Sequence, residues 1–335
     1  MSEFRQNPIS KHWVLIAPNR AKRPEDYKTR SVMEGLPELD HKCVFCPGNE
    51  AQNTELYRFP YGKNWEVRII PNKFAALEHT ALYRHKGFYV SHSGDGDHEV
   101  IVTRKHNEPV ALQSIATVEL SLETFIERIN LLTGHPELAY VQIFHNHGRE
   151  AGASLIHPHY QLIATPIVPP HVHDEIMGCY HYYQHNHTCI YCDIIKEELE
   201  VKDRVVYESE HFVVLSAYAS RKPFETWILP KKHGARFEDI SKEELRHLSF
   251  VLKVMLGQLY TKLSDPPLNF YIHTMPLKKQ QSDHRHSVQE EKAYHWHLVI
   301  FPRLTIWAGF EYATGIPINP IPPETTAQFL RGDNP

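Results

Sequence analysis

Residues able to perform chemistry at phosphorus lie in one short stretch, 154–161, which reads SLIHPHYQ. The preceding run from 140 to 144 is apolar and predicts a buried β-strand. If the stretch ends as a second strand, His157, His159 and Gln161 project from one face, because alternate strand residues share a face. A neutral imidazole is nucleophilic near pH 7, and a glutamine amide can donate to phosphoryl oxygens as charge develops. We therefore assign His159 as the candidate nucleophile and Gln161 as its catalytic donor.

Four of the five cysteines form two Cys-x-x-Cys pairs, one in each half of the chain. In a cytosolic chain this spacing favours metal binding over disulfides. Each half also supplies a histidine at the end of a predicted strand and the first histidine of a His-x-His motif. The two ligand sets are Cys43, Cys46, His106 and His157, and Cys189, Cys192, His233 and His295. Four such ligands without a carboxylate indicate closed tetrahedral sites, so we expect two structural Zn²⁺ ions per chain.

The order of elements repeats along the chain at variable spacing: Cys-x-x-Cys, a strand ending in a basic pair and a histidine, a helix, a strand, and His-x-His. Apolar residues at helical spacing predict a helix over 117–132 and another running to 259, which begins at a capping box of Ser241 and Glu244. Predicted strands cover 98–103, 205–217 (two strands), 225–233, 268–272 and 295–300. We therefore expect an α+β fold with two tandem repeats, each a mostly antiparallel sheet with a packed helix.

The repeat places an N-terminal catalytic domain at 1–168 and a C-terminal domain at 185–335, with a connector at 169–184. The histidines of 171–187 fit no single helix face, so we interpret this stretch as solvated. The polar run 278–292 is interpreted as a flexible loop.

The second half preserves only part of the chemistry of the first. His297 stands in the position of the nucleophile, but Val299 replaces the glutamine. Without a donor to the phosphoryl oxygens, we expect this copy to be structural.

Composition narrows the classes of function. The chain has 335 residues, 41% hydrophobic and 23% charged, as in a soluble globular protein. A net charge of −4 argues against nucleic acid as a partner. The first residues lack a signal-peptide pattern, and no apolar run approaches the roughly 20 residues that span a bilayer. We expect a cytoplasmic protein without membrane or nucleic-acid partners.

With these motifs the sequence resembles the galactose-1-phosphate uridylyltransferases and related nucleotide-sugar phosphorylases of the histidine triad superfamily. The resemblance covers nearly the whole chain, and His-Pro-His-x-Gln is specific for this branch. It implies two-step nucleotidyl transfer through a covalent intermediate on His159, and a homodimer whose active sites borrow residues from the partner. Matched positions imply further roles: Arg20 and Arg23 in phosphate binding, Asn72, Asn146 and Ser154 in nucleotide binding, with Ser154 also a donor at the reacting phosphate, and Phe310 near the hexose.

Several alternatives stay open within this resemblance. UDP-glucose with galactose 1-phosphate is the default pair, but the element Ala308-Gly309-Phe310-Glu311 and the second Cys-x-x-Cys are similar to plant-type ADP-glucose phosphorylases, whose acceptor is phosphate. A non-catalytic nucleotide-binding zinc protein is a further alternative. Some relatives also hold a metal with one glutamate and three histidines. The matching set in this chain is Glu175, His273, His295 and His297, in which His295 is shared with the second zinc set.

Overall fold

The computed structural model describes residues 1–20, 27–28, 33, 35–78, 84–278 and 288–333. Arg23 therefore lies outside the described residues. The main sheet carries His159, Gln161 and Asn146.

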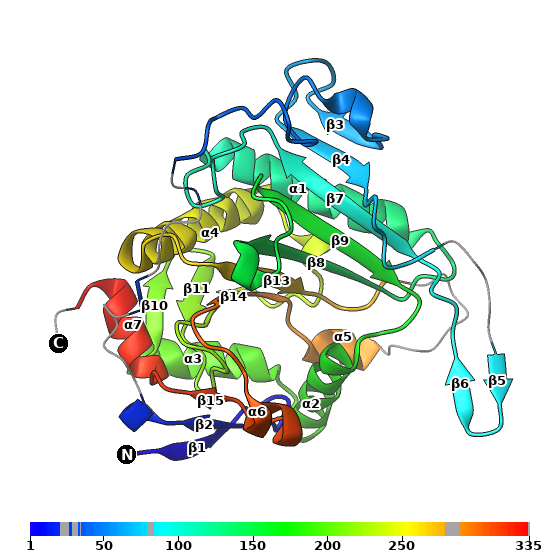
Figure 1. The fold of residues 1–335 in the computed structure, drawn as a ribbon. Helices are drawn as coiled ribbons and strands as arrows, with labels where there is room; N and C mark the ends of the chain where they lie inside the picture. Colours follow the sequence, from blue (N-terminus) through cyan, green and yellow to red (C-terminus); the bar gives the residue numbers. More distant parts are fainter. Residues whose placement is uncertain (21–26, 29–32, 34, 79–83, 279–287, 334–335) are drawn as a thin grey trace.

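Ten strands of the described chain form one sheet, in the order β10-β11-β12-β14-β13-β8-β9-β7-β4-β3 (Figure 1). Every neighbouring pair in it is antiparallel. The first-half strands are β3 (Tyr57–Phe59), β4 (Val67–Pro71), β7 (Asp97–Thr103), β8 (Tyr140–His147) and β9 (His159–Thr165). The second-half strands are β10 (Val205–Glu208), β11 (Phe212–Leu215), β12 (Thr226–Pro230), β13 (Leu268–His273) and β14 (His297–Pro302). The predicted α+β class with antiparallel strands is confirmed.

The two repeats share this sheet instead of forming separate sheets. Each contributes five strands, and the order is symmetric about the pair β8 and β13. Phe144 of β8 lies opposite Tyr271 of β13. Phe144 also pairs with Gln161 of β9, and Tyr271 with Val299 of β14. Equivalent residues therefore face each other across the junction, which places an approximate twofold axis between Phe144 and Tyr271.

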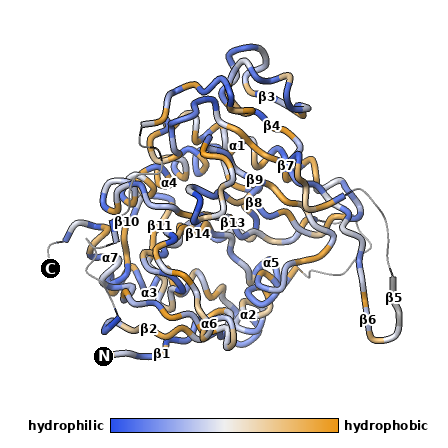
Figure 2. Tube along the Cα trace, viewed as in Figure 1, coloured by the Kyte–Doolittle hydropathy of each residue, from blue (hydrophilic) through white to orange (hydrophobic). Residues whose placement is uncertain are grey.

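Two long helices cover one face of the sheet. They are α1 (Ile115–Thr133) and α4 (Lys242–Leu263), and the predicted capping box is present at the start of α4, where Ser241 accepts from the backbone N–H of Glu244. Alternate strand residues such as Ile143, Leu162 and Ile272 pack with the apolar faces of these helices in the main core. Figure 2 shows apolar residues concentrated along the strands. The other strand face is left to carry the polar site residues.

The opposite face is covered at its second-half end by α2 (Pro170–Asn186), α3 (Ile190–Val201) and α5 (Val288–Ala293) (Figure 1). The interpretation of 171–187 as a solvated connector is wrong. Residues 172, 175, 176 and 179 of α2 are buried, which is a helical stripe that the abundant histidines obscure in the sequence. The interpretation of 278–292 as a loop is also wrong for 288–292, which form most of α5, and 279–287 lie outside the described residues.

The N-terminal segment packs beside the second half. A small sheet pairs β1 (Glu3–Gln6) and β2 (Trp13–Ile16) with β15 (Ile318–Asn319), near α6 (Gly309–Thr314) and α7 (Pro323–Arg331) (Figure 1). A hairpin of β5 (Arg84–Lys86) and β6 (Tyr89–Ser91) projects from the body. Short 3-10 turns complete the described elements: η1 (Pro18–Arg20), η3 (Glu50–Gln52), η4 (Arg149–Ala151) and η5 (Phe237–Asp239). None of the described helices is long and apolar enough to cross a membrane.

Candidate active site and metal centres

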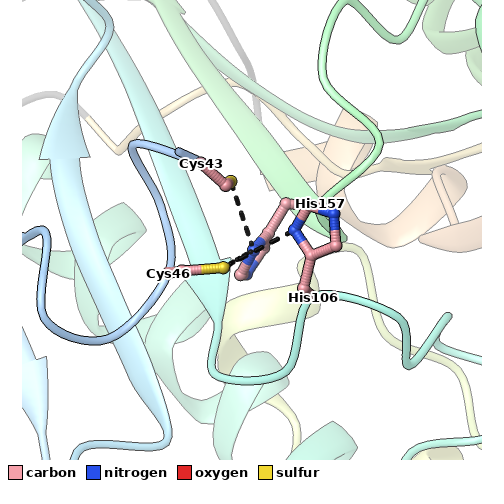
Figure 3. A group of neighbouring side chains, drawn as sticks. All are labelled: Cys43, Cys46, His106 and His157. Atoms are coloured by element: carbon pink, nitrogen blue, oxygen red, sulfur yellow. Dashed lines mark hydrogen bonds between the residues drawn. The ribbon is translucent and has the colours of Figure 1, made fainter. Parts of the chain in front are cut away.

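The first predicted ligand set converges at one end of the sheet (Figure 3). Its cysteines lie on the loop before β3, His106 follows β7, and His157 precedes β9. The Cys46 Sγ atom lies 3.5 Å from both His106 Nδ1 and His157 Nδ1, and Cys43 Sγ lies 3.7 Å from His157 Nδ1. Two sulfur and two nitrogen atoms at this spacing match the donor set of a tetrahedral structural zinc site.

The surroundings of this group also suit zinc. His157 Nε2 donates to the carbonyl oxygen of Thr103 over 2.6 Å, which turns Nδ1 toward the cysteines. Burial lowers the pKa of His157 to about 4 and keeps the ring neutral, as ligation requires. Burial also raises the pKa of the Cys46 thiol to about 11, and a metal bound here would hold Cys46 as the thiolate.

The second set repeats this arrangement at the other end of the sheet. The Cys192 Sγ atom lies 3.6 Å from His233 Nδ1 and from His295 Nδ1, and Cys189 Sγ lies 3.9 Å from His295 Nδ1. His295 Nε2 donates to the carbonyl oxygen of Pro230, the last residue of β12, as His157 does to the last residue of β7. The same donors with the same backbone support fit a second zinc ion.

The alternative glutamate-histidine set is divided by this geometry. His295 faces the cysteines, and the remaining three residues form a separate buried group, in which His273 Nδ1 lies 2.9 Å from Glu175 Oε2. His297 completes this group and its Nε2 atom has no hydrogen-bond partner in the described chain. His295, which the zinc set and the glutamate-histidine set would both need, therefore lies with Cys189 and Cys192.

His159 opens β9 with its nucleophilic nitrogen free. Its Nδ1 atom donates to the carbonyl oxygen of His157 over 2.8 Å, which fixes the tautomer and leaves Nε2 with its lone pair. The side chain is 6% exposed, and burial lowers the pKa of its imidazole. The ring of Phe45, which lies between the two zinc-site cysteines, packs edge-on against both His157 and His159, with centroids 5.9 Å and 5.5 Å away. The loop of the two cysteines therefore packs directly against the candidate nucleophile.

Gln161 lies on the same face of β9 and is held by a histidine that the sequence analysis missed. His98 of β7 accepts from the backbone N–H of Ala76 at Nδ1 over 3.2 Å, so its Nε2 carries the proton. That Nε2 lies 2.9 Å from Gln161 Oε1 and donates to it. The glutamine is thus oriented by its oxygen, and its NH₂ group stays available for a phosphoryl oxygen. The same His98 Nε2 lies 2.9 Å from Asn72 Nδ2, which brings this predicted nucleotide-binding residue into the site.

Asn146 lies on the strand beside the candidate nucleophile, and Ser154 lies on the loop between the two strands. Asn146 of β8 is the next position in register opposite His159. Asn269 of β13, also missed in the sequence, donates to Asn146 Oδ1 and to the carbonyl oxygen of Ala151, each over 2.8 Å. These bonds tie the loop after β8 to the sheet. Ser154 lies exposed on that loop, three residues before the candidate metal ligand His157.

A cavity of about 810 Å³ begins beside these residues and runs across the sheet into the second half. Phe144 and Asn146 line its first-half end, and Tyr271, Phe301 and Trp307 line its second-half end. The nucleophile and its glutamine stand on the strand adjoining this opening.

Two predicted substrate-binding residues lie far from His159 within one chain. Arg20 ends η1, directly after β2, and Phe310 lies in α6, and both elements lie away from the start of β9 (Figure 1), although Tyr312 of α6 lines the second-half end of the cavity. Both side chains are exposed. One chain alone therefore does not bring them to the nucleophile.

Comparisons with known proteins agree with this arrangement. The family model for the N-terminal domain of galactose-1-phosphate uridyl transferase matches residues 1–169, and that for the C-terminal domain matches 175–304. The chain belongs to the galactose-1-phosphate uridyl transferase family. It is a nucleotidyltransferase, as its named relatives are.

Two relatives and one solved structure show the degree of similarity. An ADP-glucose phosphorylase of Arabidopsis thaliana is 36% identical over 98% of this chain and 92% of its own length. A galactose-1-phosphate uridylyltransferase of Thermotoga maritima is 29% identical over 99% of this chain and 98% of its own. The crystal structure of an Arabidopsis thaliana ADP-glucose phosphorylase with bound ADP-glucose superposes with a TM-score of 0.84 at 32% identity, covering 100% of this chain and 99% of that one.

Proposed function

We propose that this protein transfers a nucleotidyl group from a nucleotide sugar to a phosphate acceptor through a covalent intermediate on His159. The observation that carries the proposal is the pairing of a neutral imidazole, free at Nε2, with a glutamine amide held beside it on the same strand face. A protein that only bound nucleotides would need neither feature. Zinc at the two Cys₂His₂ groups would supply structure, because all four donors at each site come from the protein.

The chemistry proceeds in two displacements at one phosphorus atom. In the first, His159 Nε2 attacks the α-phosphorus of the nucleotide sugar, the bond to the bridging oxygen breaks, and the sugar 1-phosphate leaves. In the second, an oxygen of the acceptor phosphate attacks the same phosphorus and the P–N bond breaks, which restores the imidazole. Gln161 donates to the phosphoryl oxygens as charge develops in both steps, and the exposed Ser154 adds a donor.

Two substrate pairs fit this scheme. The transferase pair is UDP-glucose with galactose 1-phosphate, which the sequence favours by default. The phosphorylase pair is ADP-glucose with inorganic phosphate. The higher identity to the ADP-glucose phosphorylase, 36% against 29%, supports the phosphorylase pair, as does the second Cys₂His₂ group. We therefore put ADP-glucose phosphorolysis first and uridylyl transfer second.

Assays of the purified protein separate these alternatives. UDP- and ADP-glucose labelled in the α-phosphate are incubated with the enzyme, with and without galactose 1-phosphate or phosphate. Label that stays on the protein until an acceptor is added supports transfer. Release by galactose 1-phosphate identifies a transferase, and release by phosphate identifies a phosphorylase. Prompt release of free nucleotide would instead identify a hydrolase, and neither labelling nor turnover would leave a binding protein.

We further propose two zinc ions per chain. The symmetric donor sets and their matching backbone hydrogen bonds support it. Elemental analysis is expected to give about two zinc atoms per chain in the native protein and about one in Cys189→Ser. A Cys189→Ser protein with unchanged zinc, or iron in place of one zinc, would contradict the assignment.

We also propose a cytoplasmic homodimer with shared active sites. The distance of Arg20 and Phe310 from His159 within one chain supports sharing, and thiol ligands need a reducing compartment. Mixing two inactive variants tests it: His159→Asn lacks the nucleophile, and Phe310→Ala lacks the borrowed contact. After subunit exchange, mixed dimers carry one intact site and should regain activity. No recovery in a mixture shown by mass to contain mixed dimers would refute sharing.

A further inference from the structure

Three cations line the second-half end of the cavity. They are Arg221 and Lys222, which precede β12, and Arg303, which follows β14. In the described part of the chain, none of the three lies within 4.0 Å of a carboxylate oxygen. Three positive charges that share one cavity wall without an ion pair form a ready site for an anion.

The backbone beneath two of these cations is fixed by a buried carboxylate. Glu225 Oε2 accepts from the backbone N–H groups of Arg221 and Lys222, over 2.8 Å and 3.1 Å. Its other oxygen accepts from Trp227 Nε1 over 3.1 Å. Both oxygens of Glu225 therefore accept hydrogen bonds from the backbone or from the indole. Among the described residues, the side chains of Arg221 and Lys222 have no carboxylate oxygen within 4.0 Å.

An indole and an imidazole hold the side chains over the cavity. Lys222 Nζ lies 4.1 Å from the centroid of the Trp307 ring, and Arg221 Cζ lies 5.6 Å from it. Arg221 Nη1 donates to His171 Nε2 over 3.1 Å. Trp307 Nε1 itself is buried and has no hydrogen-bond partner among the described residues.

Electrostatics agree with this geometry. Burial, and then the charges of Arg303 and Arg221, lower the pKa of Lys222 to about 8. The free protein thus holds these charges at a cost that a bound anion would relieve.

We propose that Arg221, Lys222 and Arg303 bind the phosphate group of a small ligand, either inorganic phosphate or a hexose phosphate, at a second site separate from the nucleotide on His159. β12 and β9 are four strand spacings apart in the sheet. At about 4.8 Å each, this is roughly 19 Å along the sheet. Nucleotidyl transfer needs reacting atoms within about 3.5 Å, so a phosphate held here is not the attacking group at the His159 of the same chain. The proposal concerns binding and does not depend on the transfer reaction.

Calorimetry on the full-length, zinc-loaded His159→Asn protein tests the site, with inorganic phosphate and glucose 1-phosphate as separate titrants. One saturable equivalent per chain is expected for at least one of them, and the tighter titrant identifies the source of the phosphate. Lys222→Met and Arg303→Met should each weaken binding about tenfold or more, the usual worth of one charge-assisted hydrogen bond. Lys278→Met, which removes one exposed lysine charge elsewhere, should leave the affinity unchanged.

Each contrary result counts against the proposal. It is overturned if neither titrant saturates, or if the lining variants and Lys278→Met weaken binding equally. It is also overturned if Gln161→Ala, at the transfer site, abolishes the binding that the lining variants retain. Circular dichroism and zinc content establish that each variant is folded. Because Arg303 is exposed, its variant keeps the test valid if Lys222→Met does not fold.

Discussion

Replacing His98 with alanine should slow nucleotidyl transfer while leaving the nucleophile in place. His98 donates to Gln161 Oε1 over 2.9 Å and so aims the glutamine amide. Losing one neutral hydrogen bond costs about 0.5–1.5 kcal/mol. Without this hydrogen bond the glutamine side chain is free to rotate, and ordering it in the transition state costs up to about 2 kcal/mol of conformational entropy. A loss of about 1–3 kcal/mol corresponds to a rate reduction of roughly 5- to 150-fold.

The assay is single-turnover formation of the labelled protein from nucleotide sugar. Removing Gln161 itself should cost roughly 10²–10³ in rate. If His98 acts through Gln161, the double variant His98→Ala/Gln161→Ala should be little slower than Gln161→Ala alone. His98 also contacts Asn72 and Ala76, so a separate rise in KM for the nucleotide sugar is expected in both backgrounds.

Two results would refute this reasoning. Independent, multiplicative losses of the first-step rate would show that His98 does not work through the glutamine. A His98→Ala enzyme at the wild-type rate would show that Gln161 needs no orienting bond. His135→Ala, at an exposed histidine beyond the end of α1, is the matched control and should leave both constants unchanged.

Three further predictions follow from the contacts described. His159→Asn should abolish the covalent intermediate with normal zinc content, whereas His157→Asn should lower both zinc content and melting temperature, as elemental analysis and calorimetry will show. Gly178→Ala should destabilise the fold by about 1–3 kcal/mol, since a Cβ there meets the carbonyl oxygen of Ile9 at 2.1 Å; an unchanged denaturant midpoint would contradict this. Glu324→Gln should flatten the acid limb of the stability curve, measured as melting temperature against pH. Burial raises the pKa of Glu324, but its hydrogen bonds, led by that from Arg5, lower it overall, so its stabilisation is present above the ordinary carboxyl pKa and is lost as pH falls through the lowered value.

The sequence was sufficient where a pattern repeats and acts locally. Both sets of candidate metal ligands come together in the structure, because each Cys-x-x-Cys is matched by histidines in the same order in both halves. The strands and long helices follow apolar periodicity, and the start of α4 follows from Ser241 and Glu244.

The sequence was insufficient where the outcome depends on contacts between distant segments. The pairing of β8 with β13 joins the two halves, and no local pattern in either strand indicates which strand will be its neighbour. His98 orients Gln161 only because β7 lies beside β9. Its position on the same strand face as Val100 and Val102 was the available signal. In α2 the buried stripe includes Glu175 and Cys179, which a search for apolar residues passes over.

The twofold relation between Phe144 and Tyr271 has an evolutionary consequence. An element that pairs with its own equivalent about a twofold axis is what two separate, identical chains form when they associate through one edge strand. The present chain has the layout of such a pair after duplication and fusion of its gene. In a fused chain the two copies can differ in sequence, whereas two identical chains cannot. In the present chain one copy carries Gln161, while the other carries Val299 at the equivalent place on the same strand face.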